Sequence, residues 1–333
     1  MTRLLPMSVI TLALLVLALS HGLAVAQTGK ANATSELPAR ELVTDPRFQN
    51  GLTLLDPAPG KIVPYGKVAG PIAGPPPQEP VWQLAQWASK YPLKAEAPLG
   101  LTGGAVRYSN EGKAIVIGSP QSGEADFSLA VNGKAEYGPQ ARKNGEPWVH
   151  LLVQQGFAHP PSLDNLAGID FHIEAKLKQS RLSRTNDYTP TLHAAQFQIF
   201  LSIQNLNHRS PGYGKYLWFG IPIYDDRERS PKGAAAKDKG TGMYIFSTPS
   251  AKFTSRSAHD KDWISLNADL LPLVRKGLET AWTNDFLTES KSESDYFVAG
   301  MNMGWEVPGV FDVDMQVRNL SIKVHEKSES PVP

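Results

Sequence analysis

From about residue 100 onward, the chain is built of short runs in which every second residue is apolar, and this pattern restricts the folds open to it. In IDFHIEAKL, residues 169–177, apolar side chains alternate with charged ones, and QFQIFLSIQ (196–204) and FDVDMQV (311–317) repeat the alternation. Successive side chains of a strand point to opposite faces, so each run predicts a strand with one buried face. Turn residues separate the runs, which together predict an all-β fold, a single β-sandwich over residues 81–326.

Two local features modify this pattern. The apolar positions shift by one place between Val317 and Leu320, which predicts a β-bulge near Asn319. The run NADLLPLVRKGLETAW, residues 267–282, has apolar residues at helical spacing, and Asn267 is its expected N-cap. The sequence therefore predicts one short helix on the sandwich.

The first residues carry a targeting signal. Arg3, an apolar run and the small residues Ala24 to Ala26 just before Gln27 predict a cleaved secretory signal peptide over residues 1–26. The alternative is an uncleaved membrane anchor, because the apolar run approaches spanning length. After cleavage, the sequence predicts no membrane span.

A Pro-rich stretch follows. Eight of the 27 prolines lie between Pro57 and Pro80, too densely for a helix or a central strand. We expect residues 27–80 to form a disordered or Pro-rich extended segment ahead of the sandwich, and residues 327–333 to form a disordered tail.

Composition narrows the classes of protein and the compartment. The chain has no cysteine, which excludes disulfides, a thiolate nucleophile and thiolate-bound zinc. With the signal peptide, this favours a bacterial periplasm or exterior. A net charge of +1 gives no electrostatic basis for binding nucleic acid or an anionic membrane. The sequence has no nucleophile elbow, phosphate-binding glycine loop or dinucleotide fingerprint.

The stretch KYLWFGIPIYDDRER, residues 215–229, places aromatic rings where a strand should face solvent. Its odd positions from Leu217 to Ile223 form an apolar face, which leaves Tyr216, Trp218 and Tyr224 on the opposite face. Such rings suit a stacking platform for sugar rings. The alternative is a second core, in which the Pro-rich segment or a loop covers the rings.

Carboxylates near these rings are the candidate catalytic groups. Asp225 and Asp226 follow the aromatic run directly, and Glu306 projects opposite Met301, Met303 and Trp305 if MNMGWEVPG forms a strand. Glycoside hydrolysis needs two carboxyl groups across the scissile bond, which sequence neighbours do not usually provide, so Asp225 or Asp226 is paired with Glu306. Glu146 and Glu174 are weaker choices. The alternative for each is a solvated carboxylate or a partner of an arginine.

The histidines give no metal signature. His150 alternates to the side of Trp148, and His172 shares a face with Glu174; either could act as a general base or only form hydrogen bonds. No histidine spacing suggests a zinc site, and we expect neither a catalytic metal nor an organic cofactor. A structural calcium site at Asp312 and Asp314 remains an alternative.

The C-terminal run YFVAGMNMGWEVPGVFDVDMQVRNLSIKVH resembles the end of alginate-lyase-type jelly rolls, and AQFQIF lies where that family has its glutamine-isoleucine-histidine strand. The resemblance covers about fifty residues and implies a jelly-roll, concanavalin-like sandwich with a connection to polysaccharides. Gln198 and Ile199 match the family's pair, but Phe200 stands in place of its catalytic histidine and Asn302 in place of its catalytic tyrosine. The lyase mechanism is therefore not carried over.

These observations favour a secreted protein that hydrolyses a polysaccharide or oligosaccharide. Two alternatives remain: a non-catalytic carbohydrate-binding protein, and a structural or adhesive envelope protein whose rings bury against a partner. The glycan, the bond and the oligomeric state are not predicted. The expected ligand-binding residues are Trp218, Tyr216, Tyr224, Gln196, Gln198, Ser202, Gln204, His150, His172 and Arg227.

Overall fold

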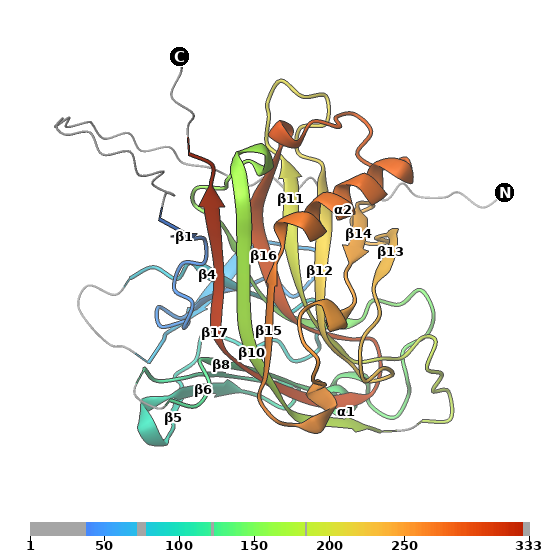
Figure 1. Cartoon of the computed structure of the whole chain (residues 1–333). Helices are drawn as coiled ribbons and strands as arrows, with labels where there is room; N and C mark the ends of the chain where they lie inside the picture. Colours follow the sequence, from blue (N-terminus) through green and yellow to red (C-terminus); the bar gives the residue numbers. More distant parts are fainter. Residues whose placement is uncertain (1–37, 72–77, 121–122, 184, 329–333) are drawn as a thin grey trace, which may run out of the picture.

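The computed structural model describes residues 38–71, 78–120, 123–183 and 185–328, which form two stacked β-sheets (Figure 1). Neighbouring strands are antiparallel except in the pairs β2·β4 and β12·β14. Sheet A has the order β15 (Ile264–Asp269), β10 (Leu166–Leu182), β17 (Phe311–Glu326), β8 (Phe127–Asn132), β7 (Lys113–Ile117), β6 (Val106–Ser109) and β5 (Leu99–Gly100), and β1 (Arg40–Glu41) pairs with β17. Sheet B has the order β13 (Ala234–Lys237), β14 (Tyr244–Ser247), β12 (Tyr216–Asp225), β11 (Gln196–Asn205), β16 (Tyr296–Val307), β9 (Val149–Gly156), β4 (Trp82–Ala85), β2 (Leu52–Leu55) and β3 (Pro64–Val68).

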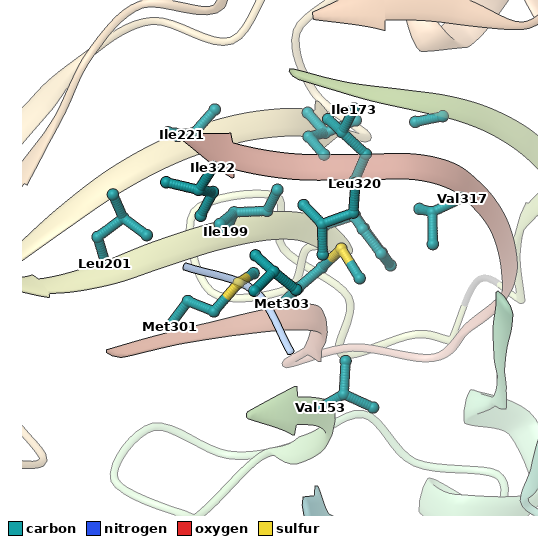
Figure 2. Close-up of a cluster of buried hydrophobic side chains, with 14 of the residues drawn as sticks. Val153, Ile173, Ile199, Leu201, Ile221, Met301, Met303, Val317, Leu320 and Ile322 are labelled. Atoms are coloured by element: carbon teal, nitrogen blue, oxygen red, sulfur yellow. The ribbon is translucent and has the colours of Figure 1, made fainter. Parts of the chain in front are cut away.

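The core lies between the sheets and contains the apolar faces that the alternation predicted. Ile199 of β11 and Met303 of β16 meet Ile173 of β10 and Ile322 of β17 in one cluster (Figure 2). A hydrogen bond of 2.9 Å joins the sheets, from Trp305 Nε1 to the carbonyl of Leu129. The all-β jelly-roll sandwich expected from the sequence is confirmed.

The predicted helix is also confirmed, with a different start. Helix α2 (Leu271–Thr283) packs against β10 of sheet A and against β12 and β14 of sheet B, so it covers the core where these strands meet (Figure 1). Asn267 is not its N-cap, because that residue belongs to β15. Asp269 Oδ1 instead accepts the Leu271 N–H at 3.0 Å. Other helical segments are short: α1 (Gly133–Tyr137) and the 3₁₀ turns Thr102–Gly104, Leu163–Asn165, Ser250–Lys252, Ala258–Asp260 and Glu293–Asp295.

The sandwich begins earlier than the sequence indicated. Strands β1, β2 and β3 lie before residue 81, and Phe48 stacks between Trp82 and Phe127 in the core. The boundary at residue 81 is therefore wrong, because Leu42, Phe48, Leu52 and other apolar residues ahead of the Pro-rich stretch are buried in the core. Strand β3 is an edge strand, where a Pro-rich sequence is tolerated. The signal peptide and most of the expected tail lie outside the described residues.

The bulge predicted near Asn319 is present. The pairing of β10 with β17 shifts between His172·Ser321 and Glu174·Arg318, and Asn319 has φ of 56°. The extra residue in β17 returns Leu320 and Ile322 to the buried face, which explains why the apolar positions shift by one place in the sequence.

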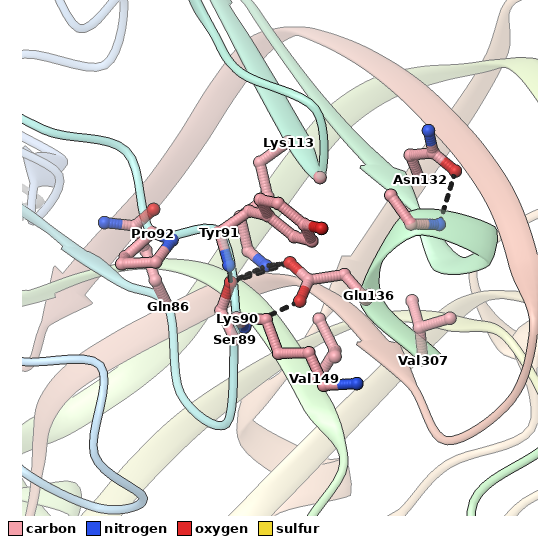
Figure 3. Close-up of polar contacts among 12 residues, drawn as sticks. Gln86, Ser89, Lys90, Tyr91, Pro92, Lys113, Asn132, Glu136, Val149 and Val307 are labelled. Carbon is pink, nitrogen blue, oxygen red and sulfur yellow. Dashed lines mark hydrogen bonds and ion pairs between the residues drawn. The ribbon is translucent and has the colours of Figure 1, made fainter. Parts of the chain in front are cut away.

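A buried ion pair joins the first part of the chain to sheet A. Lys113 Nζ lies 2.5 Å from Glu136 Oε1, and both side chains are fully inaccessible to solvent (Figure 3). Ser89 Oγ donates to Glu136 Oε1 at 2.7 Å, and the Lys90 N–H donates to Glu136 Oε2 at 2.8 Å. Burial lowers the pKa of Lys113, and the charge of Glu136 offsets part of this effect. The connection from β4 to β5 is thereby fixed to β7 and α1.

Candidate functional site

The outer face of sheet B, the face turned away from sheet A, carries most of the residues singled out in the sequence. Strand register places Asp225 of β12 opposite Gln196 of β11, Gln196 opposite Glu306 of β16, and Glu306 opposite His150 of β9. We call these four residues the cross-strand row. The first and last of these residues in the chain, His150 and Glu306, are 156 positions apart, yet four adjacent strands bring all four side by side.

Asp225 is held rigidly at one end of the row. Its Oδ1 accepts Arg227 Nε at 2.8 Å and the Arg227 N–H at 3.0 Å, and its Oδ2 accepts Arg227 Nη2 at 2.6 Å and Gln196 Nε2 at 2.7 Å. Burial alone would raise the pKa of Asp225, but the hydrogen bonds and charge of Arg227 outweigh it and leave the pKa below its ordinary value. Asp225 is therefore an ionised carboxylate whose two oxygens are fully engaged.

Glu306 lies on the other side of Gln196 and is more accessible. Its Oε2 accepts Trp148 Nε1 at 3.1 Å and lies 3.7 Å from His150 Nε2, and its side chain is 23% exposed. His150 Nδ1 lies 2.8 Å from the Trp148 carbonyl, which can only accept, so Nδ1 carries the hydrogen. In neutral His150 the Nε2 lone pair then faces Glu306 Oε2, but the 3.7 Å between the two atoms is too long for a hydrogen bond.

Aromatic rings flank His150. Trp148 stacks on the imidazole with centroids 5.4 Å apart, and Trp87 meets it edge-on at 5.7 Å. The Arg142 guanidinium lies 5.3 Å from the Trp148 ring centroid. Trp87 is fixed by its indole N–H, which donates to the Lys61 carbonyl, so the Pro-rich segment supports this side of the row.

The middle of the outer face carries amide side chains beside the ring of Phe200. Phe200 of β11 is paired with Asn302 of β16, and Asn302 is paired with Gln154 of β9, whose amide donates to Gln83 at 2.9 Å. Within the described part of the chain, the side chains of Gln198 and Asn302 have no hydrogen-bond partner. These two amides are therefore free to bind hydroxyl groups of a ligand.

The three predicted stacking rings do not share one face. Trp218 is half-buried on the outer face, in edge contact with Tyr216 at 4.9 Å and Phe200 at 6.0 Å. Tyr216 is only 7% exposed; burial raises the pKa of its hydroxyl, which also interacts with Thr241 in the loop between β13 and β14. That loop, and not the described part of the Pro-rich segment, covers Tyr216.

Tyr224 lies in the core, so its predicted position is wrong. The register of β11 with β12 shifts between Phe197·Tyr224 and Gln198·Pro222, and this bulge changes the phase of the alternation. Tyr224 consequently packs against Trp305, 5.8 Å away, and His259, 4.7 Å away. Burial raises the pKa of Tyr224 to about 12.

Several other candidates lie apart from the row. His172 and Glu174 belong to β10 of sheet A, where His172 Nδ1 contacts Asn267 and Glu174 pairs with Arg318. They are therefore not brought near Glu306. Asp226 accepts the Ala195 N–H at 2.6 Å, and Glu146 accepts the Lys143 N–H in a loop.

The remaining polar candidates have internal partners. Ser202 lies on the outer face with its hydroxyl 3.4 Å from the Gly300 carbonyl, and the buried Gln204 donates to the Gly214 carbonyl. Asp312 pairs with Arg181, and Asp314 accepts Ser128 Oγ. Across the described ranges, no cluster of acidic or histidine side chains is suited to hold a metal ion, so the pair Asp312 and Asp314 gives no support to a calcium site.

Sequence reasoning did not identify Trp87, Arg142 or Asn302 as part of this surface. The alternation in YFVAGMNMGWEV places Asn302 on the same face as Glu306, so the pattern could have identified Asn302. Trp87 lies in a turn and Arg142 in an irregular loop, where the sequence has no regular spacing that would indicate the direction of a side chain.

Comparison with solved structures gives weak similarity to jelly-roll glycoside hydrolases. A family 12 xyloglucanase from Bacillus licheniformis is 11% identical, over 73% of this chain and 100% of its own, with a TM-score of 0.40. An endoglucanase from Rhodothermus marinus is 10% identical, over 73% and 99%, with a TM-score of 0.37. A family 11 xylanase from Neocallimastix patriciarum is 11% identical, over 71% and 97%, with a TM-score of 0.35.

These neighbours are carbohydrate-active proteins of the class suggested by the C-terminal run. At such identities and TM-scores, the likeness assigns neither activity nor substrate to this chain. No protein-family model matches the sequence, and no curated protein matches it either. In the described part of the chain, no helix is long and apolar enough to cross a membrane.

Proposed function

We propose that the outer face of sheet B binds a polysaccharide or oligosaccharide and hydrolyses a glycosidic bond in it. The observation that carries this proposal is the cross-strand row, which sets two carboxyl groups, Asp225 and Glu306, on one face with an amide between them. Free amides at Gln198 and Asn302 and the ring of Trp218 supply the hydrogen bonds and the stacking surface that sugars require.

The two carboxyl groups suit different roles. Asp225 is kept ionised by Arg227, which fits a base or nucleophile. Glu306 has one oxygen near Trp148 and His150, and no hydrogen bond of its Oε1 is found among the described residues, so it is the better placed proton donor for a leaving oxygen. With the signal peptide expected over residues 1–26, we propose that this activity is secreted or periplasmic.

A non-catalytic carbohydrate-binding protein is the second candidate. The hydrogen bonds that Asp225 already accepts within the protein favour it. All the acceptor positions of Asp225 are occupied by Arg227 and Gln196, so it can take a proton only by giving up a hydrogen bond. Under this function the row would bind hydroxyl groups and break no bond.

Incubating the purified protein, from Gln27 onward, with plant, algal and bacterial polysaccharides tests both functions. Hydrolysis releases new reducing ends without the absorbance of unsaturated uronates. Glu306→Gln and Asp225→Asn should then lower the rate by at least about 100-fold. Glu174→Gln, on the outer face of sheet A, is the matched control and should leave the rate unchanged.

Retention on an insoluble glycan without new reducing ends would instead support the binding protein, and Trp218→Ala should weaken that retention. Release of both reducing ends and unsaturated uronates would mean elimination and would contradict the assigned pair. If the protein neither cleaves any glycan nor is retained on one, that result would favour an envelope protein that buries its rings against a partner.

A further inference from the structure

The spacing of the row has a stereochemical consequence, which rests on the proposed hydrolysis. Asp225 and Glu306 lie on β12 and β16, and β11 runs between them. Two strand spacings separate their backbones by about 9.5 Å. Retaining glycosidases hold their carboxyl groups about 5 to 5.5 Å apart, whereas inverting enzymes hold them about 6.5 to 9.5 Å apart to leave room for a water molecule.

Side-chain directions keep the two carboxyl groups apart. Gln196 lies between them on β11, and its amide is hydrogen-bonded to Asp225 Oδ2 at 2.7 Å. Glu306 leans the other way, toward β9, where Oε2 contacts Trp148 Nε1 at 3.1 Å and faces His150. Direct approach of the carboxyl groups to nucleophile distance would displace Gln196 and break the contact with Trp148.

We infer that the protein hydrolyses its substrate with inversion of the anomeric configuration. A water molecule in the space between the carboxyl groups attacks the anomeric carbon and gives a proton to Asp225, whose Oδ2 gives up the hydrogen bond from Gln196 to accept it. The bond from that carbon to the leaving oxygen breaks on the opposite side, and Glu306 gives its proton to that oxygen. One water is consumed, and exchange with solvent returns the proton from Asp225 to Glu306.

Proton NMR of the reaction in its first minutes, before mutarotation, tests the inference on an oligosaccharide that the protein cleaves. We expect the first product signal to be the α-anomer from a β-linked substrate, or the β-anomer from an α-linked one. A first product with the configuration of the starting bond would overturn the inference while leaving the proposed hydrolysis intact. Absence of cleavage on every glycan would overturn both.

A second measurement detects the intermediate that retention requires. The protein is treated with a 2-deoxy-2-fluoro glycosyl fluoride of the sugar it cleaves, and its intact mass is recorded. Inversion passes through no covalent glycosyl-enzyme, so no increase in mass is expected. A stable adduct located on Asp225 by peptide mapping would show that the carboxyl groups close on each other, and would overturn the inference.

Discussion

Arg227 determines the charge state of Asp225. In the folded chain the Asp225 pKa lies below the ordinary value of 3.8, so the unfolded chain binds this proton more readily. The stabilisation is therefore fully present above the ordinary pKa and is lost as pH falls through the lower pKa of the folded state.

Replacing Arg227 should make the protein more sensitive to acid. We expect Arg227→Gln to shift the midpoint of acid unfolding, followed by tryptophan fluorescence, to a higher pH than that of the unsubstituted protein. Arg229→Gln is the control, because Arg229 pairs with Asp260 through side chains that are 67% and 40% exposed and contribute little. Equal midpoints for Arg227→Gln and the unsubstituted protein would show that this pair does not couple to stability.

The pair Lys113 and Glu136 predicts a different effect on stability. Lys113→Met leaves a buried carboxylate without its cation, which should lower the free energy of unfolding by about 3 to 5 kcal/mol. The double variant Lys113→Met/Glu136→Leu removes both charges and should recover much of that loss in urea unfolding. If the double variant were as unstable as the single one, packing rather than charge would explain the result.

At the residue scale, the alternation predicted which side chains share a face but not which ones meet. It placed Glu306, Gln196 and His150 on outer faces of their strands. Only the register between strands aligns them, and register depends on turns and bulges that no single run reveals. Tyr224 shows the same limit, because one extra residue in β12 moved it from the outer face to the core.

At the scale of elements, strand β16 depends on a glycine beside the row. Gly304 has φ of 151°, and a Cβ there would lie 2.2 Å from the Leu151 carbonyl oxygen of β9. Gly304→Ala should therefore destabilise the protein by at least about 1 kcal/mol and disturb the alignment of Glu306 with His150.

Urea unfolding measures that loss, and Gly100→Ala provides the comparison. Gly100 lies in edge strand β5, and a Cβ there would have no heavy atom within 4 Å. Its substitution should change stability by less than about 0.5 kcal/mol. Comparable losses for the two variants would mean that backbone flexibility, and not the contact with β9, sets the cost.

Helix α2 and the strands in which apolar and polar residues alternate without interruption could be predicted. The spacing of apolar residues and the length of each run can be read from a short stretch of sequence. Strands β2, β3 and β4 were not, because each has only four or five residues and prolines lie close to them. Their place in the sheet comes from pairing, of β4 with β9 and β2 and of β2 with β3, which is a tertiary property.

At the scale of the whole molecule, the residues before 81 are part of the sandwich. Strand β2 lies between β3 and β4, and Leu42, Phe48 and Leu52 are buried. A chain beginning at residue 81 should therefore lack a cooperative thermal transition, whereas a chain beginning at residue 38 should unfold cooperatively. Equal melting curves for the two chains would restore the sequence-based boundary at residue 81.

Strand β17 lies at the centre of sheet A although it is the last strand, in chain order, of the described residues. It pairs with β10, β8 and β1, and its contact with β1 links Glu41 to Ile322, 281 positions apart. Before β17 arrives, the two halves of sheet A have no common strand, and the apolar side of β10 stays uncovered. Such distant pairing makes folding slow, and the incomplete chain is prone to aggregate. The pairing of β17 thus controls when sheet A can form.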